Sequence, residues 1–123
     1  MRTLIADDQA NVRSALALLL EQEPPFEIVG EAADALGLLQ AVHKHTPDLL
    51  LLDWELPGLE AEHLLHLLRY EQPCLLVAAL SSRPEAEAAA LAAGVNAFIS
   101  KGALPEQVLT AVIDLLPRQT HHQ

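Results

Sequence analysis

The fold of this chain is indicated most clearly by one stretch of its sequence, Asp48-Leu49-Leu50-Leu51-Leu52-Asp53-Trp54-Glu55-Leu56-Pro57-Gly58. Four leucines lie between two aspartates, and turn residues follow them. A short apolar run that ends in a turn predicts a strand buried on both faces, as in a parallel sheet. The residue at the carboxyl end of such a strand lies at the crevice where α/β sheets bind ligands. We therefore expect Asp53 to be a nucleophilic carboxylate, and Asp48 to mark only the start of the strand.

Apolar runs and helical stripes alternate five times along the chain. The runs predict strands at residues 4–6, 26–30, 49–52, 74–80 and 95–99. After each run, apolar residues recur at helical spacing, as Val12, Leu16, Leu19 and Leu20 do after the first. Five strand–helix units with short connections predict an α/β fold, a three-layer sandwich around a parallel sheet.

Several residues carry local predictions about where elements begin and end. Asp34 is expected to cap the second helix, and Ser82-Arg83-Pro84-Glu85 has the form of a capping box before the fourth. Gly94 is expected to end that helix in the left-handed conformation. Leu104 is a poor cap for the helix that Pro105 opens, since leucine has no acceptor. Cys74 is expected to be a small buried strand residue.

Length and composition limit the class of protein. A chain of 123 residues predicts one domain, placed at residues 1–117, with 118–123 as a polar tail or linker stub. The net charge of −10 argues against direct binding of nucleic acid, which needs basic surface. A lone cysteine, Cys74, favours a reducing, cytoplasmic location. The amino terminus does not resemble a signal peptide, and no apolar run approaches the roughly 20 residues of a membrane span.

Polar residues follow four of the predicted strands: Asp7 and Asp8, Asp53, Ser81, and Lys101. The carboxyl ends of parallel strands share one edge, so we expect these side chains to converge. Three carboxylates close together favour a cation, and hard oxygen ligands suit Mg²⁺. A carboxylate can also attack a phosphoryl group, whose charge a metal ion, an ammonium and a hydroxyl stabilise.

These residues resemble the receiver domain of bacterial two-component response regulators. The resemblance rests on the acidic pair after the first strand, Asp53 with Leu56-Pro57-Gly58 behind it, Ser81, and Phe98 three residues before Lys101. It covers about residues 2–117 and implies a flavodoxin-like (βα)5 sheet of order 2-1-3-4-5. Any one of these residues alone has a plainer explanation as a turn, cap or surface residue, so the ordered set carries the hypothesis.

The resemblance implies a role for each site residue. Asp53 would accept a phosphoryl group from a histidine kinase, and Ser81 and Lys101 would hold the phosphoryl oxygens. Mg²⁺ would be bound by Asp8, Asp53 and the backbone carbonyl of Glu55, with Asp7 acting through water. Phe98 would be an aromatic switch that turns inward when Ser81 moves towards the phosphate.

The resemblance also implies a partner and an output. Residues 100–106 resemble receivers attached to helix-turn-helix output domains of the LuxR type, so control of transcription is the expected output. The face made by the fourth helix, fifth strand and fifth helix would transmit it, or a homodimer through the first and fifth helices would. The domain itself is then a phosphoacceptor rather than an enzyme, and DNA is bound only by a separate domain.

Three alternatives remain open at this point. The chain can be a stand-alone receiver. It can be a phosphohydrolase that uses Asp53 as nucleophile and Glu55, two residues on, as general acid. It can also be a binding module that keeps the fold and works without phosphate. Glu55 and Arg83 are expected to lie beside the path of a hydrolytic water and to tune loss of the phosphoryl group.

Overall fold

The central sheet has five parallel strands in the order β2-β1-β3-β4-β5. A computed structural model of the chain describes residues 1–117. Its sheet order is that of the flavodoxin-like fold, which confirms the predicted fold class. The predicted tail at 118–123 lies outside the described residues. The strands are β1 (Arg2–Ala6), β2 (Glu27–Ala32), β3 (Leu49–Asp53), β4 (Leu76–Ser81) and β5 (Ala97–Ser100).

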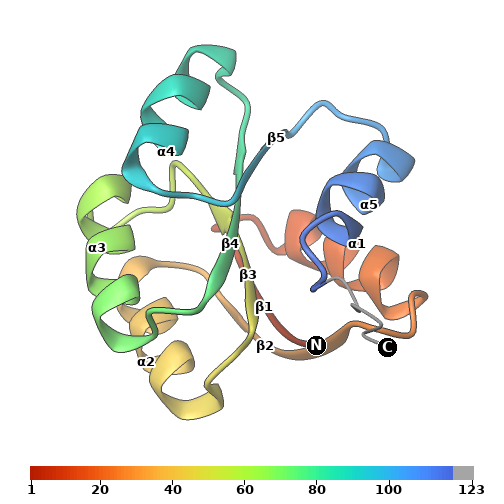
Figure 1. The fold of residues 1–123 in the computed structure, drawn as a ribbon, viewed down its shortest axis with the longest axis horizontal. Coiled ribbons are helices and arrows are strands. Elements are labelled where there is room, and N and C mark those ends of the chain that lie inside the picture. Colours follow the sequence, from red (N-terminus) through yellow and green to blue (C-terminus); the bar gives the residue numbers. More distant parts are fainter. Residues whose placement is uncertain (118–123) are drawn as a thin grey trace, which may run out of the picture.

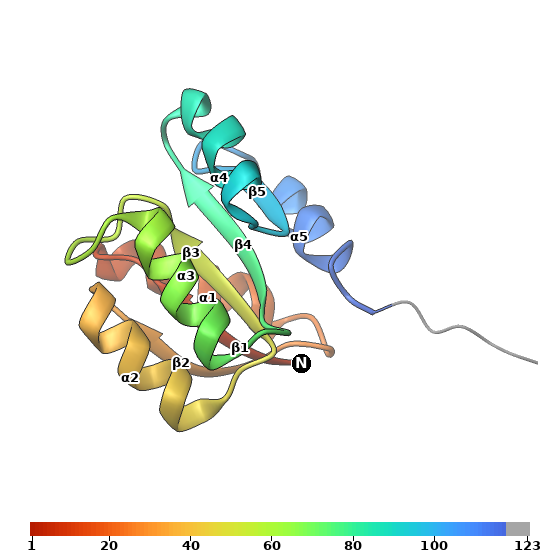
Figure 2. The same cartoon turned by 60° about the vertical axis from the view of Figure 1, so that its left-hand side comes forward.

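Helices cover both faces of the sheet. Figure 1 shows α2, α3 and α4 on one face and α1 and α5 on the other. Figure 2 shows α3 between α2 and α4, and α3 contacts both. Within the described range, no helix is both long and apolar enough to cross a membrane. The helices are α1 (Ala10–Glu21), α2 (Ala35–His45), α3 (Ala61–Glu71), the short 3₁₀ helix η1 (Pro84–Ala86), α4 (Glu87–Ala93) and α5 (Pro105–Ile113).

The four leucines of β3 divide between the two hydrophobic cores. Leu50 and Leu52 belong to the core under α2, α3 and α4, whereas Leu49 and Leu51 belong to the core under α1 and α5. Each is 0 % exposed. Full burial of a leucine side chain stabilises a fold by about 1.5–3 kcal/mol relative to exposure. These four residues therefore fix β3 at the centre of the molecule, with Asp53 at its carboxyl end.

Each strand differs from its predicted range by one or two residues at one end or both, and the prediction that Cys74 is buried in a strand is wrong. Strand β4 begins at Leu76, and Cys74 lies exposed in the turn before it. The turn is closed by a hydrogen bond of ordinary length, 3.1 Å, from the Leu75 amide to the Gln72 carbonyl. Strand β2 runs two residues further than predicted, because pairing with β1 continues to Ala32.

The predicted helix ends were right in three cases and wrong in one. Asp34 Oδ1 accepts a hydrogen bond from the Gly37 amide at 2.8 Å, and Gly94 ends α4 with φ of 111°. Leu104 stands at the N-cap of α5 without a side-chain hydrogen bond. Ser82 does not form a capping box, because the helical segment begins at Pro84 with Arg83 as its N-cap.

Candidate functional site

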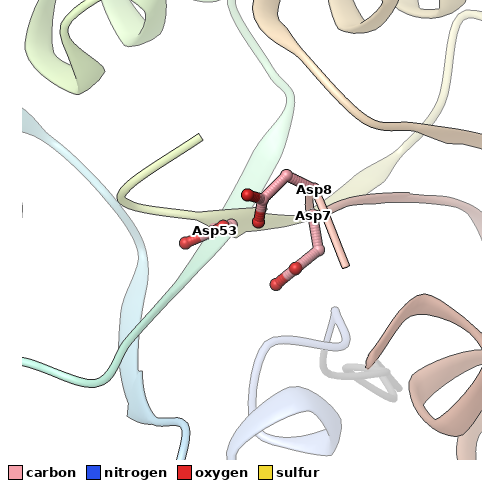
Figure 3. Close-up of side chains that lie close together, drawn as sticks. All are labelled: Asp7, Asp8 and Asp53. Carbon is pink, nitrogen blue, oxygen red and sulfur yellow. The ribbon is translucent and has the colours of Figure 1, made fainter. Parts of the chain in front are cut away.

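The ends of β1 and β3 bring three carboxylates together, as the sequence predicts (Figure 3). One oxygen from each of Asp7, Asp8 and Asp53 lies within 4.8 Å of the others. Asp7 and Asp53 are 2 % exposed, whereas Asp8 is exposed. The cluster therefore has two buried members and one that faces solvent, which is where an ion would enter.

This donor set fits Mg²⁺. All three side chains offer hard carboxylate oxygens, and the cluster contains no thiolate or imidazole. With all three ionised, three negative charges and the one positive charge of Lys101 leave two negative charges, which a divalent cation neutralises. The chemistry of the donors thus supports the predicted magnesium site.

Lys101 reaches the same cluster from the loop after β5. Its Nζ lies 2.9 Å from Asp7 Oδ2 and 3.1 Å from Asp53 Oδ1. The Lys101 amide donates to the Ser81 carbonyl at 3.0 Å, which extends the pairing of β4 and β5 by one step. An ammonium has three N–H donors, so one remains for a further anionic group after the two carboxylates are served.

Burial and the ion pairs shift the pKa values of two groups in this site, Asp53 and Lys101. Burial raises the pKa of Asp53 above its ordinary value, against the hydrogen bonds from the Glu55 amide and Lys101, and the charge of Asp7 raises it further. Burial alone would lower the pKa of Lys101, but its hydrogen bonds to Asp7 and Asp53 outweigh that effect and raise it. Lys101 is therefore charged at neutral pH, and ionisation of Asp53 is less favourable in free energy than for an ordinary aspartate.

Two hydrogen bonds from backbone amides hold the loop after Asp53 where it leaves β3. The Trp54 amide donates to the Leu80 carbonyl at 2.7 Å, and the Glu55 amide donates to Asp53 Oδ1 at 3.0 Å. Further on, Gly58 adopts φ of 114°, a conformation that favours glycine. Trp54 is only 7 % exposed and belongs to the core, a role that its position after a strand did not reveal.

Ser81 is buried and bound by two residues that flank the site. Its Oγ lies 2.8 Å from Glu55 Oε2 and accepts a hydrogen bond from the Arg83 amide at 3.0 Å. The Arg83 guanidinium in turn lies 3.3 Å from the same Glu55 oxygen. The spacing of Glu55 and Arg83, two residues after Asp53 and Ser81, predicts that they flank the site, but no signal in the sequence indicates that they bind Ser81 and each other.

Two predicted roles are not tested by these contacts. Phe98 is half-buried, pairs with Ala79 in the register of β4 and β5, and packs against the core under α2, α3 and α4. Its switch role stays a prediction. The same holds for the backbone carbonyl of Glu55 as a metal ligand.

Comparison with known proteins finds one family across nearly the whole chain. The family model of the response regulator receiver domain matches residues 3–113. A protein-glutamate methylesterase/protein-glutamine glutaminase of Pyrococcus abyssi is 34 % identical over 105 residues, which are 82 % of this chain and 28 % of the relative. The probable transcriptional regulatory protein NarL of Mycobacterium tuberculosis is 28 % identical over 116 residues, 93 % of this chain and 54 % of the relative.

A solved structure agrees with this likeness. The isolated receiver domain of RcsB from Salmonella enterica, determined in the presence of the phosphomimetic BeF3−, superposes with a TM-score of 0.86 at 25 % identity. The match covers 94 % of this chain and 87 % of that one. The two curated relatives are longer, and this chain spans about a quarter of the first and about half of the second.

Proposed function

The chain belongs to the response regulator receiver domain family, and on that basis we propose that Asp53 accepts a phosphoryl group from a histidine kinase in a two-component system. The observation that carries the proposal is the position of Asp53, buried at the end of β3 within reach of Asp7, Asp8 and Lys101. These groups are what phosphoryl transfer to a carboxylate requires: a nucleophile, a cation site and a fixed positive charge.

The two oxygens of Asp53 have different tasks in this mechanism. Oδ1 accepts from the Glu55 amide and from Lys101, which orients the carboxylate and leaves Oδ2 to attack. The new bond joins Oδ2 to phosphorus as the P–N bond to the donor imidazole breaks, and the imidazole keeps the electron pair. Lys101 has one N–H left to donate to a phosphoryl oxygen, and Ser81 is the proposed second donor.

Asp7, Asp8 and Asp53 would hold Mg²⁺, with the Glu55 carbonyl as a further ligand. The ion would supply charge neutralisation for the phosphoryl oxygens. In its absence Asp8, the exposed member, is the residue whose charge solvent screens most. Phe98 is proposed to turn inward when Ser81 engages the phosphoryl group.

The proposed output is control of transcription through a separate DNA-binding domain. The likeness to NarL, a probable transcriptional regulatory protein, and to an RcsB structure described for its DNA interaction supports it, and α4, β5 and α5 would form the signalling face. A homodimer through α1 and α5 is the alternative route. The methylesterase relative shows that receivers of this family also stand beside enzyme domains, so the gene sequence after residue 123 decides the output. The unpaired Cys74 supports a cytoplasmic location.

Labelling with acetyl phosphate and Mg²⁺ tests the proposal. Intact-mass measurement is expected to show one added phosphoryl group that hydroxylamine removes, because hydroxylamine cleaves acyl phosphates. Asp53→Asn should abolish the label. Asp48→Asn is the matched control, since Asp48 is an exposed carboxylate just before the opposite end of β3. Full labelling of Asp53→Asn would remove Asp53 from the role.

The phosphohydrolase alternative gains no support from the site. Its general acid would be Glu55, whose carboxylate is engaged with Ser81 and Arg83. Stable labelling without multiple turnover of a small phosphoester would count against it. Intact folding and Mg²⁺ binding without any labelling would favour the binding-module alternative.

A further inference from the structure

The hydroxyl of Ser81 already has an anionic partner. Ser81 is 1 % exposed, and its Oγ lies 2.8 Å from Oε2 of Glu55, which comes from the loop after β3. Arg83 holds that carboxylate from the other side, with Nη2 at 3.3 Å and Nε at 3.4 Å. The three side chains thus form a connected network beside Asp53, in which the central group is the Glu55 carboxylate.

A serine hydroxyl has a single hydrogen to donate. The acceptor side of Ser81 Oγ is occupied by the Arg83 amide at 3.0 Å. The hydrogen faces Glu55 at 2.8 Å in preference to the Arg83 carbonyl at 3.4 Å, because the carboxylate is both closer and charged. Carboxylate and phosphoryl oxygens only accept hydrogen bonds, so Ser81 can serve Glu55 or a phosphoryl group on Asp53, but not both at once.

We infer that the Glu55 side chain is an internal competitor for the Ser81 hydroxyl, which holds the domain in its resting arrangement until a phosphoryl group on Asp53 displaces it. The inference rests on the proposed function. It differs from tuning of a hydrolytic water, because it makes Glu55 set the balance between resting and phosphoryl-bound arrangements. Arg83 keeps Glu55 aimed at Ser81 and neutralises its charge when Ser81 leaves.

The test is a double-mutant cycle of Glu55→Ala and Ser81→Ala, read by calorimetric titration with beryllofluoride and Mg²⁺. Beryllofluoride serves as the phosphoryl mimic, as in the RcsB structure. Glu55→Ala is expected to tighten binding about fivefold, since it frees a donor from a charged acceptor. In the Ser81→Ala background the same change should alter affinity less than about twofold, because the contested hydroxyl is gone.

A matched variant separates the hydrogen bond from the loss of charge. Glu60→Ala removes an equal charge from the same loop, and Glu60 is exposed and makes no side-chain cap. It should leave beryllofluoride affinity unchanged. Equal tightening in Glu55→Ala and Glu60→Ala, or equal tightening by Glu55→Ala with and without Ser81, would overturn the inference in favour of a general charge effect.

The contact can also be measured at rest. Urea unfolding, with metal removed by a chelator, is measured for the wild type, Glu55→Ala, Ser81→Ala and the double variant. The changes in free energy of unfolding should be non-additive, because Glu55 and Ser81 are hydrogen-bonded before any phosphoryl group arrives. Additive unfolding energies would overturn the inference. Failure of the wild-type protein to bind beryllofluoride would contradict the proposed function, and this inference with it. Normal beryllofluoride binding together with an additive double-mutant cycle would contradict the inference alone.

Discussion

Asp53 is a buried carboxylate whose proposed reaction requires it to be ionised, and burial makes that ionisation unfavourable. Four buried leucines carry it to the sheet edge, where it is 2 % exposed and faces Asp7. Burial raises its pKa, so ionisation of Asp53 costs more in the folded protein than in the unfolded chain. A nucleophilic carboxylate must nevertheless be ionised, and Lys101 offsets part of that cost.

Asp53→Asn is therefore expected to raise the thermal unfolding midpoint by a few degrees at pH 7 without metal. The folded state binds the Asp53 proton more tightly than the unfolded state, so this residue's contribution is most favourable at low pH and is lost as pH rises through the raised pKa. The gap between variant and wild type should close as pH falls below about 3.9, the ordinary pKa of aspartate. Asp48→Asn, an exposed carboxylate, should not stabilise the protein. A lower midpoint for Asp53→Asn at pH 7 would contradict the argument.

At the scale of elements, the start of α5 is incompletely capped. The Leu104 amide donates to Gln107 Oε1 at 2.9 Å, which is one half of a capping box. The other half is missing because leucine has no side-chain acceptor, and Leu104 is 58 % exposed. Its replacement therefore sacrifices little buried area.

Leu104→Ser should stabilise the domain by about 0.5–1 kcal/mol, because serine supplies the missing acceptor at the N-cap. Urea unfolding measures the change. Leu104→Ala is the matched control, since it removes the same apolar surface without adding a hydroxyl. If serine and alanine give equal stability, the cap is not what α5 lacks.

A second element-scale feature is the junction of α3, α4 and β4. Asn96 Oδ1 accepts from the Val77 amide and from Arg69 Nη2, both at 2.8 Å. Arg69 also donates to the Gly94 and Leu75 carbonyls. Residues far apart in sequence thus satisfy the backbone groups at the start of β4.

Asn96→Ala is expected to destabilise the domain by about 1–2 kcal/mol, because it leaves the Val77 amide without its side-chain acceptor. Denaturant unfolding should show the loss as a lower midpoint with an unchanged slope. Asn11→Ala, an exposed position on α1, should change stability by less than about 0.5 kcal/mol. Similar losses of stability in Asn96→Ala and Asn11→Ala would contradict a stabilising role for the Asn96 hydrogen bonds.

At the scale of the whole molecule, the site exists only where separate strand ends meet. Asp7 and Asp8 follow β1, Asp53 ends β3, and Lys101 follows β5. Strands β1 and β3 are adjacent in the sheet, which brings the carboxylates together. The unfolded chain scatters these groups, so an ion that binds them favours the folded state.

Mg²⁺ at one hundred times its dissociation constant should raise the free energy of unfolding by about 2.7 kcal/mol, and the thermal unfolding midpoint should rise with it. Asp8→Asn should reduce this gain, since it removes the exposed carboxylate of the cluster and leaves the buried ones in place. Asp114→Asn, an exposed acid after α5, removes the same charge away from the cluster. Equal Mg²⁺ gains in both variants would mean that the ion acts through general screening.

Residue patterns alone predict the fold class and the convergence of Asp7, Asp8, Asp53 and Lys101, and the family resemblance adds the order of the strands. Apolar periodicity and strand-end positions are local signals, and a parallel sheet converts them into one shared edge. Local signals gave wrong predictions where the burial or hydrogen bonding of a residue depends on the surrounding structure. Cys74 was expected inside β4, but the preceding turn leaves it exposed, and Ser82 looked like a cap that the chain does not use.

The pairing of the groups within the site depends on how the folded chain packs. The bond between Glu55 and Ser81 joins residues 26 positions apart, and no spacing rule specifies which carboxylate a buried hydroxyl will meet. The same is true of the burial of Trp54 and of the direction of the Asp53 pKa shift. Burial and hydrogen-bond partners depend on the packing of several elements at once, whereas a sequence pattern reports on one element at a time.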